Sequence, residues 1–304
     1  MGNLAEEICT SFSRGRSSCE TAAYWRATAW EEMEFDLIKM VYGSNRIASA
    51  GNSFSITVQL CQSAFRDEVT SAAIERGDPT LKEHGRFLRA SRRSVSLRNI
   101  WLSRREILQH AYALGYMIDH VVLDRKPWSE ELILETHRVL LHCLKDGVQP
   151  GCYRSYELAV KYEGPDRRHT LDPRMPSTLI PRYMSDMIER LNRDTARTDA
   201  GELDPYALAA RYHNHFVLIH PFANGNGRMA RIVLNCLMLR HAGHVSDLGV
   251  EADERDQYWG ITTRLTRMFP AEDLDAELLA NPRNRELAEI LRRKGQQADG
   301  CWTV

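Results

Sequence analysis

Apolar residues recur at steps of three and four along most of this chain, which is the pattern of helices that bury one face. From Trp25 to Val41 this spacing places the large apolar side chains on one stripe. It predicts a second strong helix from Trp101 to Val122 and a weaker one from Ile56 to Ala73. The first half of the chain is therefore expected to be mainly helical.

Capping residues mark further helices in the second half. Ser129 precedes two acidic residues, and Asp204 precedes a proline that suits the first turn of a helix. Gly243 is the expected terminator of another helix. Together with the apolar periodicity, these signals predict helices over residues 130–147, 182–191, 205–220 and 227–240.

The pattern changes between Pro150 and Ile180. Prolines and glycines interrupt any helix there, and residues 156–162 (YELAVKY) alternate partly between apolar and polar. We predict a small β-hairpin or flap in this region, so the expected fold class is all-α with one small β insertion.

Length and composition narrow the class of protein. A chain of 304 residues allows about two domains, or one elaborated domain. Its 40 basic and 41 acidic side chains nearly cancel, so no nucleic-acid partner is expected. The sequence contains no apolar run of about 18 residues, no signal-peptide core and no Cys-x-x-Cys pair. We therefore expect a cytoplasmic protein that makes no membrane contact.

One segment departs from this charge balance. From Arg86 to Arg105 the chain holds seven arginines and no acidic residue. Such a run is usually a solvated face, although it could also contact phosphates or present Ser94 to a kinase.

The segment that carries chemistry is His220-Pro-Phe-Ala-Asn-Gly-Asn-Gly-Arg-Met-Ala-Arg231, between two predicted helices. Gly225 and Gly227 let the turn present backbone N–H groups just before a helix N-terminus, which favours a bound phosphate. Arg228 and Arg231 can hold further phosphate oxygens. The imidazole of His220 can take a proton from an attacking hydroxyl. The segment is thus expected to support nucleophilic attack on phosphorus.

This segment closely resembles the signature of the Fic family, His-x-Phe-x-Asp/Glu-Gly-Asn-Gly-Arg-x-x-Arg, and departs from it at Asn224. Pro150-Gly151-Cys152-Tyr153-Arg154 is similar to a second stretch of that family. The resemblance implies the Fic fold, a helical bundle with a small β-hairpin flap. We expect an N-terminal helical extension, a catalytic core and a C-terminal helical tail, over residues 1–100, 101–245 and 246–304.

The resemblance implies transfer of AMP from ATP to a Ser, Thr or Tyr hydroxyl of a target protein, with release of pyrophosphate. His220 would be the base, and Phe222 would anchor the loop. Phosphates would be held by the side chain or backbone of five residues, namely Gly225, Asn226, Gly227, Arg228 and Arg231. The expected partners are ATP and a hydroxyl-bearing protein, and a homodimer is compatible with the resemblance.

Asn224 stands where the family has an acidic residue that ligates Mg²⁺. Magnesium prefers carboxylates but also accepts amide carbonyls, so Asn224 remains the expected metal ligand, with weaker binding. The substitution puts metal affinity, nucleotide preference and rate in question.

A segment within residues 30–52 resembles an inhibitory motif of the family, Ser/Thr-x-x-x-Glu-Gly/Asn, whose glutamate pairs with the second signature arginine. The alignment matches Ser44 and places Ala48 at the glutamate position, with two residues inserted before the Gly-Asn pair. On this alignment Arg231 lacks a carboxylate partner, and the enzyme is released from autoinhibition. A rival placement, after the second predicted helix, uses Glu75 instead.

Family members place an aromatic pair near the adenine, and Tyr258 and Trp259 lie about where that pair would fall. Thr266 stands at the position of a family asparagine on the same helix, which leaves base recognition open. The alternative is that both aromatic residues belong to the core.

The resemblance favours a protein adenylyltransferase, and three other functions stay open. The chain could use another nucleotide or remove AMP from a modified protein. It could be a nucleotide-binding pseudo-enzyme that acts as a regulatory module. A toxin-like relative that phosphorylates its target is the third alternative.

Overall fold

The computed structural model describes residues 20–66, 71–144, 148–158, 160–163, 168–171, 175–268 and 282–299. Most of these residues are helical, so the predicted all-α class is confirmed.

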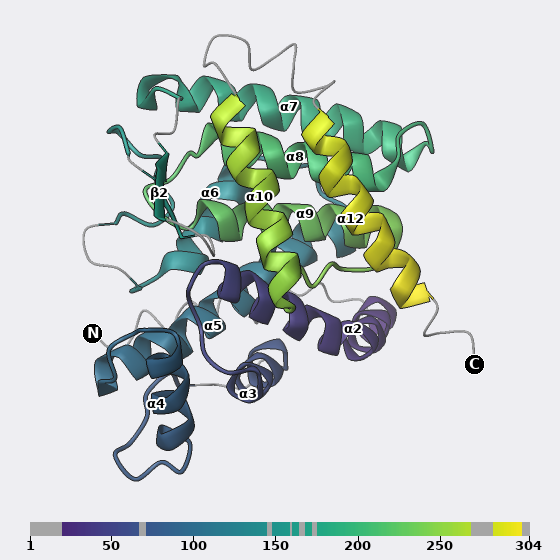
Figure 1. Ribbon diagram of the computed structural model, residues 1–304. Coiled ribbons are helices and arrows are strands. Elements are labelled where there is room, and N and C mark those ends of the chain that lie inside the picture. The colour runs from purple at the N-terminus through teal and green to yellow at the C-terminus, as the bar shows by residue number, and fades with distance from the viewer. Residues whose placement is uncertain are drawn as a thin grey trace.

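Helices α8 (Pro205–Ile219) and α9 (Asn226–Ala242) form the centre of the bundle (Figure 1). Both are buried on most sides, with Phe216 and Met229 at 0% exposure. Five helices surround the pair, with α7 (Ile180–Asp199), α10 (Ala252–Met268) and α12 (Pro282–Asp299) against α8, and α2 (Glu20–Ile47) and α5 (Leu97–Ile118) against α9. The loop that joins α8 to α9 is therefore fixed by the core of the fold.

The remaining elements extend this bundle. Helix α6 (Glu130–Leu141) packs against α5 and α7, and α3 (Phe54–Phe65) packs against α2 and α5. Helix α4 (Leu81–Ala90) lies beside α5, away from the central pair (Figure 1). A π-helical turn (Asp119–Leu123) continues α5, and a 3₁₀ turn (Ser177–Leu179) leads into α7.

Several capping predictions are confirmed. The Ser129 side chain accepts the Leu132 N–H at the start of α6, and Asp204 accepts the Ala207 N–H at the start of α8. Gly243 ends α9 with φ 77°, a left-handed conformation that glycine adopts without strain.

Two predicted helices are too long. Helix α3 ends at Phe65, and residues 71–75 have no regular structure. Arg104 accounts for part of this difference, because its guanidinium donates to the carbonyls of Ser71 and Ala72. Helix α6 ends at Leu141, and the predicted end at residues 146–147 lies outside the described residues.

Two short strands interrupt the helices between α6 and α7. Strands β1 (Val160–Glu163) and β2 (Arg168–Leu171) pair antiparallel, with Val160 opposite Leu171. They fall in the region where proline and glycine exclude a helix.

One hydrophobic cluster joins the three predicted parts of the chain. Leu37 of α2, Leu114 of α5 and Leu287 of α12 all belong to it, each at 0% exposure. The extension and the tail therefore share a core with the predicted catalytic region.

Candidate active site

The loop from His220 to Gly225 begins with a sharp reversal at the end of α8. His220 has φ 48° and ψ 59°, a left-handed conformation, and its backbone N–H donates to the Phe216 carbonyl at 3.0 Å. The loop ends at Gly225, which has φ 81° and precedes the first turn of α9. A Cβ at Gly225 would lie 3.4 Å from Leu141, an ordinary contact, so it is the left-handed conformation that favours glycine here.

Phe222 anchors this loop, as expected. It is fully buried and stacks on the His137 ring of α6, with ring centroids 3.5 Å apart. Nδ1 of His137 accepts the Gly151 N–H at 2.9 Å, so Nε2 carries the proton and donates to the Asn224 carbonyl at 3.0 Å. Burial lowers the pKa of His137 to about 4, which keeps the ring neutral. His137 therefore holds the loop in two ways, by stacking on Phe222 and by a hydrogen bond to the Asn224 carbonyl.

The Asn226 side chain is committed to the loop itself. Its Oδ1 accepts the Phe222 N–H at 2.9 Å, and its Nδ2 donates to the Phe222 carbonyl at 2.7 Å. In this conformation Asn226 is 3% exposed and both ends of its amide are used within the loop. The Asn226 side chain therefore braces the loop, and the backbone N–H groups at the start of α9 remain the expected phosphate ligands.

Arg154 holds the other side of the loop. Its Nε donates to the His220 carbonyl at 2.9 Å, and its backbone N–H donates to the Pro221 carbonyl at 2.9 Å. Its Nη2 donates to the Met175 carbonyl at 2.7 Å. A buried arginine thus connects the catalytic loop to the segments on either side of the two strands.

His220 is neutral in this environment. Burial and, to a smaller extent, the positive charge of Arg154 lower its pKa to about 4, against the opposite effect of a backbone hydrogen bond with Val217. A neutral imidazole at pH 7 can accept a proton from a hydroxyl, as a general base must.

We predict that acid destabilises this fold between pH 6.5 and pH 4. Burial lowers the pKa of four histidines from the ordinary value of 6.5. The pKa falls to about 4 for His137, His213 and His220, and to about 3 for His215. In this window the unfolded chain binds protons that the folded chain does not, so stability falls as pH falls. At pH 5.5 each of these histidines lowers the free energy of unfolding by roughly 1 kcal/mol.

The measurement is the thermal unfolding midpoint at pH 7.5, 6.5, 5.5 and 5.0 at constant ionic strength. We expect a steady decrease below pH 6.5 that reverses when the sample returns to pH 7.5. A midpoint that stays constant down to pH 5.0 would contradict the buried, neutral state of these rings.

Arg228 lies in the first turn of α9 with an unpartnered donor. The residue is 7% exposed, and its Nη1 has no hydrogen-bond partner within the part of the chain that the structure describes. Burial lowers the pKa of Arg228, Glu106 raises it, and Arg231 lowers it. A buried guanidinium with an unused donor beside a helix N-terminus fits an anionic oxygen such as that of a phosphate.

Arg231 is enclosed and bonded on three sides. Its Nε donates to Ser44 Oγ and its Nη2 to the Ser44 carbonyl, both at 2.8 Å, and its Nη1 donates to the Tyr258 hydroxyl at 3.0 Å. The residue is 2% exposed. No carboxylate is bonded to Arg231 among the described residues, yet the end of α2 covers it.

Tyr258 holds Arg231 from the opposite side. Its ring is 3% exposed, and its hydroxyl also pairs with His213 Nε2 at 3.0 Å. In this conformation Tyr258 belongs to the core, which is the alternative that the sequence left open for it. Tyr258 positions the guanidinium of Arg231.

The geometry separates the two placements of the inhibitory motif. Ser44 contacts Arg231, and Ala48 follows it by one helical turn, exposed at the surface. Glu75 is also exposed, in a segment that Arg104 holds through the carbonyls of Ser71 and Ala72. The placement through Ser44 is thus the one that contacts the second arginine of the signature segment.

Asn224 is the single side chain of the loop suited to Mg²⁺. Its Oδ1 accepts the Gly225 N–H at 2.6 Å and retains a second lone pair. No group of three His, Cys, Asp or Glu side chains that could hold a metal ion occurs in the described ranges. One amide oxygen fits a magnesium ion whose other ligands are phosphates and water, which is a common arrangement for this metal.

Sequence reasoning missed the residues that position the loop. His137, Arg154 and His213 act through contacts with residues 45 to 87 positions away in the chain. Arg154 lies in the stretch that resembles the family, which is the one signal that could have drawn attention to it.

The fold and the loop together define a helical domain in which a braced loop leads into the N-terminus of α9. Residues 127–238 match the model of a known family, described as the Fic/DOC family. Protein adenylyltransferase fic-1 of Caenorhabditis elegans is 37% identical over 108 residues, which are 36% of this chain and 18% of that protein. Residues 127–238 therefore form a domain of the Fic/DOC family.

Two solved structures share the fold. A Fic domain containing signaling protein from Bacteroides thetaiotaomicron aligns with a TM-score of 0.61 at 19% identity, over 95% of this chain and 93% of that chain. Fic-1 (aa134–508) from C. elegans aligns with a TM-score of 0.59 at 19% identity, over 97% of this chain and 70% of that chain. Among the described helices, none is long and apolar enough to cross a membrane. The sequence match covers 18% of the length of the curated C. elegans relative.

Proposed function

We propose that this chain is a protein adenylyltransferase that transfers AMP from ATP to a hydroxyl side chain of a target protein. The observation that carries the proposal is a neutral His220 on a braced loop, at the start of a helix whose Arg228 is buried and has an unused donor. The curated relatives named protein adenylyltransferase support the same activity.

In the proposed reaction, His220 takes the proton from the target hydroxyl. The hydroxyl oxygen forms a bond to the α-phosphorus, and the bond from that phosphorus to the bridging oxygen breaks. Pyrophosphate leaves with the electron pair of the broken bond. The N–H groups at the start of α9 and the Arg228 guanidinium stabilise the negative charge of the phosphates, and Arg154 and His137 keep the loop in place for this step.

The paired strands β1 and β2 are the proposed flap. A β-strand edge can align an extended peptide through backbone hydrogen bonds, which suits targets of varied sequence. Arg154 ties the loop to the segments at both ends of the strands, so target binding and the catalytic loop are mechanically connected.

We propose that the chain is released from carboxylate inhibition but keeps a weaker contact. Ala48 supplies no charge, while Ser44 offers Arg231 a neutral hydroxyl and a carbonyl. Hydrogen bonds to neutral groups are weaker than those to a carboxylate, so ATP can displace Ser44 more easily than it could displace a glutamate. Ser44 and Ala48 are the proposed regulatory residues.

Replacing Asn224 by an acidic residue is expected to strengthen the binding of Mg²⁺. Asn224→Asp should lower the Mg²⁺ concentration that gives half-maximal transfer by about tenfold, because a carboxylate binds this cation more strongly than an amide. The measurement is the initial rate at fixed ATP across a magnesium titration, with Asn224→Ala as the matched control. A half-maximal concentration that does not fall for Asn224→Asp would remove Asn224 from the proposed metal site.

A nucleotide-binding regulatory module is the second candidate. It is favoured by the missing carboxylate at Asn224 and by the enclosure of Arg231 at 2% exposure. Incubation with ATP and Mg²⁺ followed by intact-protein mass spectrometry separates the two functions. The transferase gives an AMP adduct on the chain or on an added target, whereas the module binds ATP and stays unmodified.

A further inference from the structure

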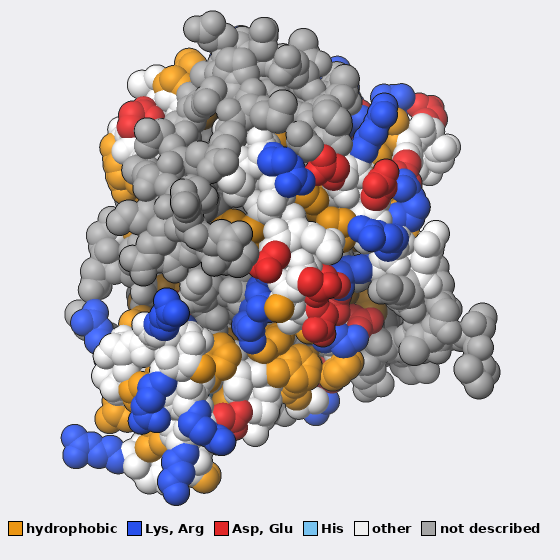
Figure 2. Space-filling model, viewed as in Figure 1, with side chains coloured by type: hydrophobic (Ala, Val, Ile, Leu, Met, Phe, Trp, Pro, Cys, Tyr) orange, Lys and Arg blue, Asp and Glu red, His pale blue; other side chains and the backbone are white. Residues whose placement is uncertain are grey.

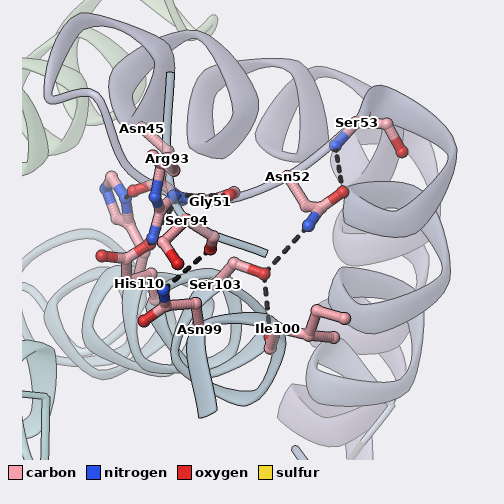
Figure 3. Close-up of polar contacts among 11 residues, drawn as sticks. Asn45, Gly51, Asn52, Ser53, Arg93, Ser94, Asn99, Ile100, Ser103 and His110 are labelled. Carbon is pink, nitrogen blue, oxygen red and sulfur yellow. Dashed lines mark hydrogen bonds and ion pairs between the residues drawn. The ribbon is translucent and has the colours of Figure 1, made fainter. Parts of the chain in front are cut away.

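The connection from α2 to α3 is held by residues far from the signature loop in sequence. Glu106 of α5 accepts the Gly51 N–H at 2.8 Å and an Arg93 N–H at 3.0 Å through the same carboxylate oxygen. Arg93 also donates to the Gly51 carbonyl at 3.0 Å. Figure 3 shows Arg93 and Gly51 within this polar cluster. We call Gly51, Arg93 and Glu106 the Gly51 clamp.

The Gly51 clamp is partly shielded from water. The side chains of Arg93 and Glu106 are 21% and 20% exposed, although they lie near a surface that is rich in basic side chains. Figure 2 shows these Lys and Arg side chains gathered over α4, where Lys82, Arg86 and Arg89 are exposed. Arg93 differs from these neighbours because both of its terminal nitrogens are used inside the fold.

The clamp connects to the end of α2 through short contacts. Gly51 has φ 73°, and a Cβ there would lie 3.1 Å from the Cβ of Asn45. Asn45 Oδ1 pairs with His110 Nδ1 of α5 at 3.0 Å, and the Ala50 N–H donates to the Asn45 carbonyl at 2.9 Å. Asn45 directly follows Ser44, the residue that covers Arg231. Gly51 is therefore linked to the contact with Arg231 through Asn45 and Ser44.

We propose that the Gly51 clamp sets how tightly the end of α2 covers Arg231, so that Arg93 and Glu106 are positioning residues that control the access of a phosphate group to this arginine. Three of the five N–H donors of Arg231 are bonded, two of them to Ser44, and at 2% exposure a phosphate oxygen can reach the guanidinium only if the end of α2 shifts. The clamp resists that shift. The inference rests on the proposed function only for its transfer readout.

The test compares Arg93→Gln with Arg89→Gln in the full chain. Both variants remove one positive charge, but Arg89 lies on the exposed face of α4 outside the clamp. We expect Arg93→Gln to increase amide hydrogen exchange over residues 44–53 and to tighten the binding of a fluorescent ATP analogue by about tenfold, from the loss of a charged hydrogen-bond network. Arg89→Gln should leave both unchanged. Loss of a positive charge alone would weaken the binding of an anion, so the expected direction is opposite to a simple charge effect.

Two further variants test whether the clamp acts through the contact between Ser44 and Arg231. Arg93→Lys keeps the pair with Glu106 and should give intermediate values. Ser44→Ala should also tighten nucleotide binding, and combining it with Arg93→Gln should give less than the sum of the two effects, because both act on one contact. Thermal unfolding midpoints within a few degrees of the parent confirm that the variants are folded.

The outcomes separate this inference from the proposed function. Unchanged exchange, or increased exchange without tighter nucleotide binding, overturns the control role of the clamp. Equal tightening by Arg89→Gln also overturns it. Absence of AMP transfer in the parent and in every variant would count against the proposed function, while exchange and nucleotide affinity would still decide the role of the clamp.

Discussion

Replacing His220 by alanine is expected to lower AMP transfer by about 10²- to 10⁴-fold, which is the usual contribution of a positioned general base. Nucleotide binding should persist, since the backbone at the start of α9 and Arg228 remain. The measurement is the initial rate of labelling with ATP and Mg²⁺, together with the dissociation constant of a fluorescent ATP analogue. A loss of both would indicate that the loop had collapsed and would not identify the base.

A second substitution protects this result against a folding artefact. His220 has φ 48°, a conformation that asparagine tolerates better than alanine does. His220→Asn should therefore keep the turn between α8 and α9 and the unfolding midpoint, yet lose transfer to the same extent as alanine. Transfer by His220→Asn at more than about a tenth of the parent rate would show that the imidazole is not the base.

Replacing Ala48 by glutamate is expected to suppress transfer by about tenfold to a hundredfold, the range of a hydrogen bond that involves a charged group. Ala48 lies four residues after Ser44, just past the end of α2, and its N–H donates to the Ser44 carbonyl at 3.3 Å, which keeps it one turn away from the residue that contacts Arg231. A carboxylate at position 48 could reach the Arg231 guanidinium beside Ser44. Because Ala48 is exposed, the substitution meets no steric barrier in the core.

This prediction depends on the negative charge of the glutamate introduced at position 48. Ala48→Gln has nearly the same size without the charge and should retain most of the parent rate. The suppression by Ala48→Glu should appear mainly as a higher KM for ATP. If glutamate and glutamine have the same effect, the contact with Arg231 is steric, and the alignment of the inhibitory motif through Ser44 loses its support.

The helical framework could be predicted from the sequence because its signals are local. Ser129, Asp204 and Gly243 act within one helical turn, and their caps occur where expected. The end of α3 could not be predicted in this way, since the carbonyls of Ser71 and Ala72 bind a guanidinium from α5. A tertiary contact of this kind leaves no trace in the local periodicity.

The candidate site shows the same division. The positions of His220 and Arg228 follow from the spacing of one twelve-residue segment, and the structure places both as that spacing implies. The bracing contacts of Asn226 and Tyr258 could not be predicted, because residue type does not reveal which side chains are buried in such contacts. The covering of Arg231 by Ser44 joins residues 187 positions apart, so only the folded chain brings them together.

The central claim is adenylyl transfer by the loop that begins at His220. Parallel incubations of the full chain with ATP labelled at the α-phosphate and ATP labelled at the γ-phosphate, each with Mg²⁺, test it most directly. We predict protein-bound label from the α-labelled ATP alone, with release of pyrophosphate and loss of the signal in His220→Asn. Label from the γ-phosphate, or label from the α-phosphate that persists in His220→Asn, would contradict the account.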